Sequence, residues 1–129
     1  MHMRNPKIHR LGPLQFKIMK VLWARGEANV ADVNGALDGG DELAYTTVAT
    51  MLRKMEQRGL VTHTVEGRTF IYRPAVAEEA VTGDMADDLL DRVFEGSLAD
   101  MVSHLLTTRE VSTEELARLE RLIVERKKE

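Results

Sequence analysis

Five side chains with hydroxyl, amide or cationic groups fall on one face of the helix predicted over residues 44–58. They are Thr46, Thr50, Arg53, Lys54 and Gln57. A threonine hydroxyl can contact a phosphate or a base edge, and an arginine can fork onto guanine or clamp a phosphate. Lysine adds a point charge that suits a phosphate. This combination is typical of a helix that enters the major groove of DNA.

A β-hairpin is predicted directly after this helix, and it bears a further cation. Residues 60–65 and 69–73 alternate and are rich in β-branched and aromatic side chains, with a turn over residues 66–69. A solvated amphipathic helix standing alone would also explain the polar face. The neighbouring hairpin favours DNA instead, because a wing in this place would hold Arg68 against the backbone or the minor groove.

Other kinds of chemistry have no matching pattern in the sequence. The four histidines are scattered over different predicted elements, and with no cysteine there is no thiolate metal ligand. Ser103 and His104 are neighbours, so on a helix they would point about 100° apart and would not form a nucleophile–base pair. His63 could face DNA, but its place in the strand favours a solvent-exposed residue. We therefore expect no enzyme activity, no cofactor and no metal.

Three helices are expected to position the polar face and the hairpin. Apolar residues at helical spacing predict helices over residues 11–25 and 29–37, with Asn29 as the N-cap of the second, before the helix over 44–58. Gly39 and Gly40 are expected to end the second helix. The expected core positions are Leu14, Ile18, Val21 and Leu22, with Phe16 and Met19 flanking, in the first helix and Val48, Met51, Leu52 and Met55 in the third. Three short helices followed by a hairpin predict a winged helix-turn-helix.

The remainder of the chain is predicted to be helical throughout. Helices are expected over residues 77–95, from Ser97, and from Ser112, where Ser112 and Glu115 form a capping box. Each helix has a wide apolar stripe, and a small bundle cannot bury all of them, so we expect a second copy to cover them. The predicted dimerisation residues are Leu89, Val93, Leu98, Met101, Val102, Leu105, Leu116, Leu119 and Ile123.

The expected fold is therefore mainly α with a small β-hairpin wing, and two domains are predicted. A winged-helix domain would occupy residues 1–74, and a helical dimerisation domain residues 75–129.

The charge divides in the same way. The whole chain of 129 residues has a net charge of −3, but residues 1–74 carry 11 basic and 7 acidic side chains, and residues 75–129 carry 7 and 14. A basic segment is what attraction to a phosphate backbone requires.

The location expected for the protein is the cytoplasm. No apolar run approaches the roughly 20 residues that span a bilayer, and the N-terminus lacks the apolar block of a secretory signal. The absence of cysteine is compatible with a reducing compartment.

Short motifs along nearly the whole chain resemble the penicillinase-repressor family, of the BlaI/MecI type. The matching residues are Leu22-Trp23 with Gly26, Ala44-Tyr45-Thr46-Thr47-Val48 with Thr50, Gly59-Leu60-Val61, Gly67-Arg68, Tyr72-Arg73-Pro74, Phe94-Glu95-Gly96-Ser97 and Val111-Ser112-Thr113-Glu114-Glu115-Leu116. The resemblance implies a homodimeric transcriptional repressor whose N-terminal winged helix binds a palindromic DNA operator. It places Thr46, Thr47, Thr50 and Arg53 on the recognition helix and Arg68 on the wing.

The resemblance also implies a route of derepression. In the family, a membrane sensor-protease for β-lactams commonly triggers cleavage in the C-terminal part, at an Asn–Phe bond in staphylococcal members. The matching positions here are His104 and Leu105, so a regulatory protease is an expected partner. The copper-responsive branch of the family carries a cysteine-rich C-terminal motif, and this chain, with no cysteine, does not resemble that branch.

Two other readings of the sequence remain open. The winged helix could be a protein–protein interaction module whose hairpin contacts a partner protein. Alternatively, the C-terminal part could hold a small effector in an apolar cleft, because the seven methionines offer an adaptable lining.

Overall fold

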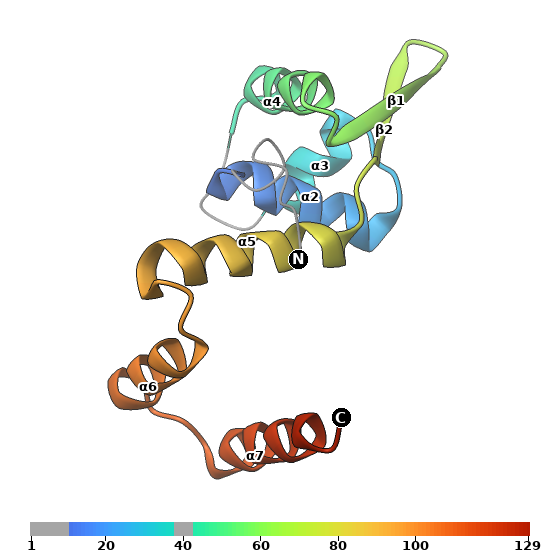
Figure 1. Cartoon of the computed structure of the whole chain (residues 1–129). Helices are drawn as coiled ribbons and strands as arrows, with labels where there is room; N and C mark the ends of the chain where they lie inside the picture. The colour runs from blue at the N-terminus through green and yellow to red at the C-terminus, as the bar shows by residue number, and fades with distance from the viewer. Residues whose placement is uncertain (1–10, 38–42) are drawn as a thin grey trace. The chain divides into compact units, whose positions relative to one another are not determined.

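The computed structural model of the chain describes residues 11–37 and 43–129. Its internal contacts divide the chain after Asp88 into two compact units. Figure 1 labels the helices and strands in chain order. They are α2 (Pro13–Arg25), α3 (Val30–Ala36), α4 (Tyr45–Gln57), β1 (Val61–Glu66), β2 (Thr69–Pro74), α5 (Glu78–Phe94), α6 (Leu98–Thr108) and α7 (Thr113–Lys127). The pattern of helices and a hairpin confirms the predicted fold class.

Local signals in the sequence set the ends of the first helices. Pro13 occupies the first turn of α2, and the helix ends at Gly26, whose φ of 84° lies in the region that glycine adopts readily. As predicted, Asn29 caps α3, because its side chain accepts a hydrogen bond of 2.7 Å from the backbone N–H of Asp32. Gly39 and Gly40 lie outside the described residues.

The core of the first unit is formed by apolar side chains from each of its helices and strands. Ile18, Met19, Leu22, Val33, Val48, Leu52, Met55, Leu60, Val61 and Val81 have their side chains fully buried. In α2 the expected core positions are partly wrong: Met19 is buried rather than flanking, whereas Leu14 and Val21 are only half-buried. The physical reason is that α3 and β2 both pack on α2, so the buried arc of this helix is set by two neighbouring elements and not by its own spacing. In α4, Met51 is half-buried beside a fully buried stripe.

The hairpin joins β1 and β2 antiparallel, with Val61 opposite Pro74 and Glu66 opposite Thr69. This register leaves a two-residue turn, in which Gly67 has a φ of 64° that a side chain would disfavour. At the base of the hairpin, Ala28 and Tyr72 exchange two backbone hydrogen bonds of 3.0 and 2.9 Å. The segment between α2 and α3 therefore anchors the wing to the helices.

The start of α5 packs within the first unit. Val81 is fully buried in the core, and the indole Nε1 of Trp23 donates a hydrogen bond of 2.9 Å to the carbonyl of Val76. Lys20 forms an ion pair of 2.9 Å with Glu78. The domain boundary expected after Pro74 thus differs from the division of the compact units, since the first turns of α5 complete the winged-helix core.

The second unit contains the end of α5 followed by α6 and α7. The hydroxyl of Ser97 caps α6 by accepting from the N–H of Asp100, and the hydroxyl of Ser112 caps α7 by accepting from the N–H of Glu115, both at 3.1 Å. The predicted capping serines are therefore present. Neither α6 nor α7 contains a buried residue. In the described part of the chain, every helix falls short of the length and apolar character that crossing a membrane demands.

Candidate nucleic-acid interface

The six polar residues predicted on α4 share one exposed face of the helix. Thr46, Thr47, Thr50, Arg53, Lys54 and Gln57 are all exposed. At about 100° per residue they cover an arc of about 120°. Thr46, Thr47, Thr50, Met51 and Lys54 line a shallow depression on the surface. The opposite stripe of α4 is fully buried, so the core itself turns the polar face outward.

The C-terminal part of α4 is tied to α2 through Gln15. The Oε1 of Gln15 accepts hydrogen bonds from Arg58 Nη1 at 2.9 Å and from the backbone N–H of Gly12 at 3.2 Å. Its Nε2 lies 3.4 Å from the sulfur of Met51. The contacts with Arg58 and Met51 join the two helices, and they restrict rotation of α4 about its axis.

A second tie joins α4 to the hairpin. The Nδ1 of His63 on β1 lies 2.7 and 2.8 Å from the two carboxylate oxygens of Glu56 on α4. The ring of His63 also stacks on Phe70, with centroids 4.3 Å apart and planes inclined by 13°. His63 is therefore less exposed than expected: its side chain is 28% exposed, and Glu56 and Phe70 both contact it.

The electrostatics of Tyr72 connect the same elements. Burial raises the pKa of the Tyr72 hydroxyl above its usual value of 10.0, and the carboxylate of Glu56 and the hydroxyl of Tyr45 raise it further. The guanidinium of Arg53 acts in the opposite direction and lowers the pKa. Arg53 lies one turn before Glu56 on α4, and Glu56 is the residue that contacts the hairpin through His63.

Arg68 occupies the second position of the hairpin turn and is exposed. Figure 1 shows α4 and the hairpin at the same end of the first unit. By contrast, Arg73 on β2 is paired, because its guanidinium bonds the hydroxyl of Thr64 at 2.7 Å and the carboxylate of Glu27 at 2.9 Å. The structure thus brings the polar face of α4 and the cation at the tip of the wing to one end of the unit.

The sequence-based selection of interface residues omitted three exposed side chains near this end. Tyr45 at the start of α4 and the hairpin residues Val65 and Phe70 are all more than 40% exposed. The period-2 alternation of the strands places Val65 and Phe70 on the apolar side of the hairpin. The alternation could have identified Val65 and Phe70 as interface residues, but the same alternation equally predicts that their side chains are buried in the core.

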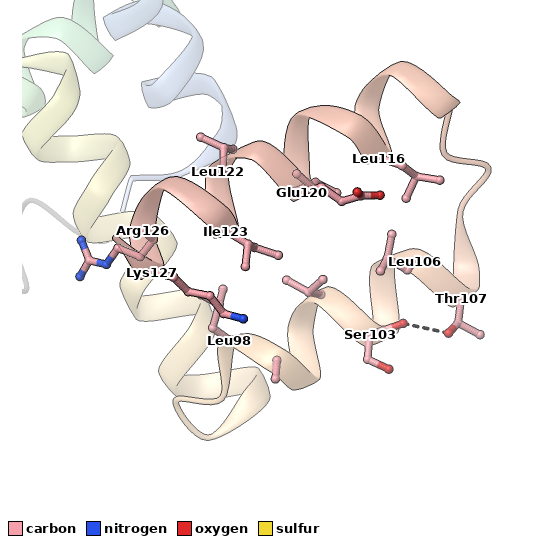
Figure 2. A pocket seen from close by; sticks show the side chains of 13 residues that line it. Leu98, Ser103, Leu106, Thr107, Leu116, Glu120, Leu122, Ile123, Arg126 and Lys127 are labelled. Carbon is pink, nitrogen blue, oxygen red and sulfur yellow. Dashed lines mark hydrogen bonds between the residues drawn. The ribbon is translucent and has the colours of Figure 1, made fainter. Parts of the chain in front are cut away.

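A second surface of note lies between α6 and α7. It is a groove of about 1030 Å³, lined mainly by leucine, valine and isoleucine side chains. Figure 2 shows Leu106 from α6 and Ile123 from α7 pointing into the space between the helices. This groove and a smaller adjoining one include six of the predicted dimerisation residues, namely Leu98, Val102, Leu105, Leu116, Leu119 and Ile123. The other three, Leu89, Val93 and Met101, do not line either groove.

None of the nine predicted dimerisation residues is buried within the chain.

His104 and Leu105, the expected cleavage position, lie in the interior of α6, where the ring of His104 contacts Phe94 at a centroid distance of 5.8 Å. A search of the described ranges for three or more His, Asp or Glu side chains able to hold a metal ion finds no such group.

Comparison with known proteins agrees with this geometry. The family model described as "Penicillinase repressor" matches residues 11–125. The penicillinase repressor of Bacillus licheniformis is 30% identical over 121 residues, covering 94% of each chain. The transcriptional regulator BlaI of Mycobacterium tuberculosis is 34% identical over 121 residues, covering 92% of this chain and 86% of the relative.

A solved structure shares the fold of the first unit. The solution structure of the DNA-binding domain of the repressor BlaI covers 60% of this chain and 93% of its own length, with 28% identity and a TM-score of 0.50. The family model alone matches well over half of the chain, and both relatives are at least 30% identical over more than nine-tenths of it. The chain belongs to the penicillinase repressor family.

Proposed function

We propose that this chain, a DNA-binding transcriptional repressor by its family, binds a two-fold symmetric operator as a homodimer. In this proposal α4 enters the major groove, and the turn of the hairpin contacts the backbone or the minor groove. The observation that carries the proposal is the exposed threonine, arginine and lysine face of α4, fixed beside a wing that ends in Arg68.

Each part of the interface has a distinct role. The hydroxyls of Thr46, Thr47 and Thr50 contact phosphates or base edges near the start of α4, as is common for the N-terminal residues of a recognition helix. Arg53 supplies the forked donor that suits guanine, and Lys54 the point charge that suits a phosphate. Gln57 extends the polar face by one further turn. Arg68 contributes a phosphate or minor-groove contact from the wing.

The homodimer is supported by the apolar surface that α6 and α7 leave uncovered. Leu98 and Ile123 are 65% and 55% exposed, and Leu116 and Leu122 are also exposed. An apolar surface of this extent on a small unit is typical of an interface rather than of a free surface. A second copy that covers it would present two recognition helices to two half-sites, which is the usual match between a two-fold dimer and a palindrome.

Derepression is proposed to follow cleavage near His104 and Leu105. Both residues lie within α6, and a protease needs an extended backbone, so α6 must open locally before the chain can be cut. Cleavage there would separate α7 from the rest and remove the dimer surface. A repressor of this kind acts where the DNA lies, in the cytoplasm.

The central test is selection of bound sites from random DNA duplexes, followed by affinity measurements on the selected operator. Arg53→Ala should bind about 5- to 100-fold more weakly, the range for loss of one bidentate contact to a base. Arg53→Lys keeps the positive charge but loses the forked pair of donors, so its operator affinity should lie between that of the parent and that of Arg53→Ala. Lys20→Ala, which removes a cation beside α5, is the matched control and should bind as the parent does.

The salt dependence of binding distinguishes this function from a protein–protein interaction module. A protein that neutralises phosphates loses DNA affinity steeply as salt rises, because bound counterions are released. A steep slope, dyad-symmetric selected sites and a defect confined to the Arg53 variants support the proposal. Operator affinity of Arg53→Ala equal to that of the parent at matched salt would contradict it.

A further inference from the structure

The hairpin carries two apolar side chains beyond the point where the core ends. The register places Val65 on β1 directly opposite Phe70 on β2. The two side chains are 57% and 45% exposed. We call Val65 and Phe70 the wing pair. Because paired residues of an antiparallel ladder share a face, the wing pair lies on the same face as His63 and Tyr72.

This face of the hairpin is the one that α4 packs against. His63 is bound to Glu56 of α4 at 2.7 Å, and Phe70 stacks on the His63 ring at 4.3 Å. The wing pair therefore continues the surface that begins at α4, and its aromatic member is held by a ring that is itself tied to the recognition helix. The position of Phe70 relative to α4 is thus set by direct contacts.

The charges on the hairpin differ between its two faces. Glu66 lies on the opposite face from the wing pair, opposite Thr69, together with Thr62 and Thr64. Arg68 lies in the turn directly beyond the wing pair. On the wing-pair face the carboxylate of Glu56 is paired with His63 at 2.7 Å, and Glu66 is turned to the other face. An apolar pair next to an exposed arginine complements a surface that alternates apolar patches with negative charges.

The backbone of a DNA duplex is such a surface, since each phosphate is joined to a deoxyribose whose C–H groups are apolar. We propose that Val65 and Phe70 pack on deoxyribose sugars of the operator backbone, while Arg68 contacts the adjacent phosphate. The inference rests on the proposed function and deepens it: the wing supplies an apolar, sugar-directed contact in addition to its cation.

Salt dependence separates an apolar contact from an ionic one. Packing against a sugar releases no counterion, whereas each lost phosphate contact reduces the slope of log affinity against log salt by about one. Phe70→Ala is therefore expected to weaken operator binding about tenfold with the slope unchanged, and Val65→Thr about three- to fivefold. Arg68→Ala is expected to weaken binding and also to reduce the slope by about one.

The variants are chosen to keep the hairpin intact. Threonine has the shape and β-branching of valine, so Val65→Thr changes one methyl group to a hydroxyl and little else. Phe70→Leu keeps an apolar side chain and should retain most of the affinity. A hydroxyl-radical footprint, which reads the accessibility of deoxyribose hydrogens, should lose protection at the sugars beneath the wing in Phe70→Ala, while the sugars next to α4 stay protected.

The possible outcomes are distinguishable. Weaker binding with an unchanged salt slope and lost sugar protection supports the inference. If Val65→Thr and Phe70→Ala bind and footprint as the parent does while Arg53→Ala binds more weakly than the parent, the inference is overturned and the proposed function stands. If all three variants bind as the parent does, the proposed function itself is overturned.

Discussion

The cationic side chains of the first unit are of two kinds: some form ion pairs within the unit, and others project from the face of α4 and the tip of the wing. Lys20 pairs with Glu78, Arg25 with Asp32 at 3.7 Å, and Arg73 with Glu27. Exposed pairs of this kind contribute little stability, at most about 1 kcal/mol each. They nevertheless neutralise charge away from α4. Arg53, Lys54 and Arg68, in contrast, project from the helix face and the wing tip, where a phosphate backbone would meet them.

Tyr72 gives a prediction at the same scale. Its pKa is raised above 10.0 because burial and the Glu56 carboxylate disfavour the phenolate. The stability from the neutral hydroxyl is therefore fully present below about pH 10 and is lost as the pH rises through the folded-state pKa. The chain has two tyrosines, so in a Tyr45→Phe variant only Tyr72 forms tyrosinate.

The titration can be followed by tyrosinate absorbance in the folded variant and in denaturant. We expect the midpoint in the folded variant to be higher than the midpoint in denaturant. Equal midpoints would show that Tyr72 is solvated and that the base of the wing is not packed as described. Unfolding of Tyr72→Phe should also depend less on pH above 10 than unfolding of the parent does.

At the scale of elements, α3 is the part of the winged helix most dependent on its cap. It is a helix of 7 residues, and Val30 and Val33 hold it on the core. A helix so short is not stable alone, so its start must be fixed by a side chain. The orientation of α4 depends in turn on α3, which packs against it.

Replacing the cap tests this dependence. Asn29→Ala removes the acceptor for the Asp32 N–H and should lower the free energy of unfolding by about 1 kcal/mol. For a domain of this size that corresponds to a fall in Tm of about 4–8 °C. Asn29→Asp keeps an acceptor oxygen and is the matched control, with a Tm close to that of the parent. If the alanine variant melts at the parent temperature, the hydrogen bond at Asn29 does not stabilise α3.

At the scale of the whole molecule, the net charge of −3 combines two segments of opposite sign. The basic segment contains α4 and the wing, and the acidic segment contains α6 and α7. Like charge between the acidic helices and DNA would disfavour approach of that part to the duplex, while the basic part is attracted. The apolar groove of α6 and α7 is left to contact protein.

The homodimer can be tested on the grooves between α6 and α7. Leu105 and Leu119 line the smaller groove, and Leu119 also lines the larger one. A charge at either position would be buried without a partner in the dimer, so Leu105→Asp and Leu119→Asp should give monomers by light scattering. Both should also bind the full operator more weakly, because a single reader loses the advantage of two linked half-sites.

Val124 provides the control for this experiment. It lies on α7, is 51% exposed and lines neither groove. Val124→Asp should therefore remain a dimer with normal operator affinity. Full-length dimers in all three variants would exclude the groove as the interface, and a monomeric Val124→Asp would show that the interface includes another face of α7.

The sequence by itself determined the order and type of the elements, because the signals for these are local. The spacing of Val48, Leu52 and Met55 defines the buried stripe of α4 and thereby its exposed face. The cap at Asn29 and the turn at Gly67 depend on residues a few positions away, so they too could be predicted. Most candidate DNA-contacting residues of α4 follow from the same periodicity, whereas Thr47 was added by the family resemblance and Arg68 by the predicted hairpin turn.

Only the tertiary structure decided which surfaces are covered. Nothing local to His63 indicates that Glu56 and Phe70 enclose it, since burial depends on which elements pack together. The same reason explains the first turns of α5, where Val81 completes the winged-helix core although the strand ends at Pro74. It also explains Val65 and Phe70, whose alternation suits a buried strand face. They stay exposed because the hairpin extends past the last residue that could cover them.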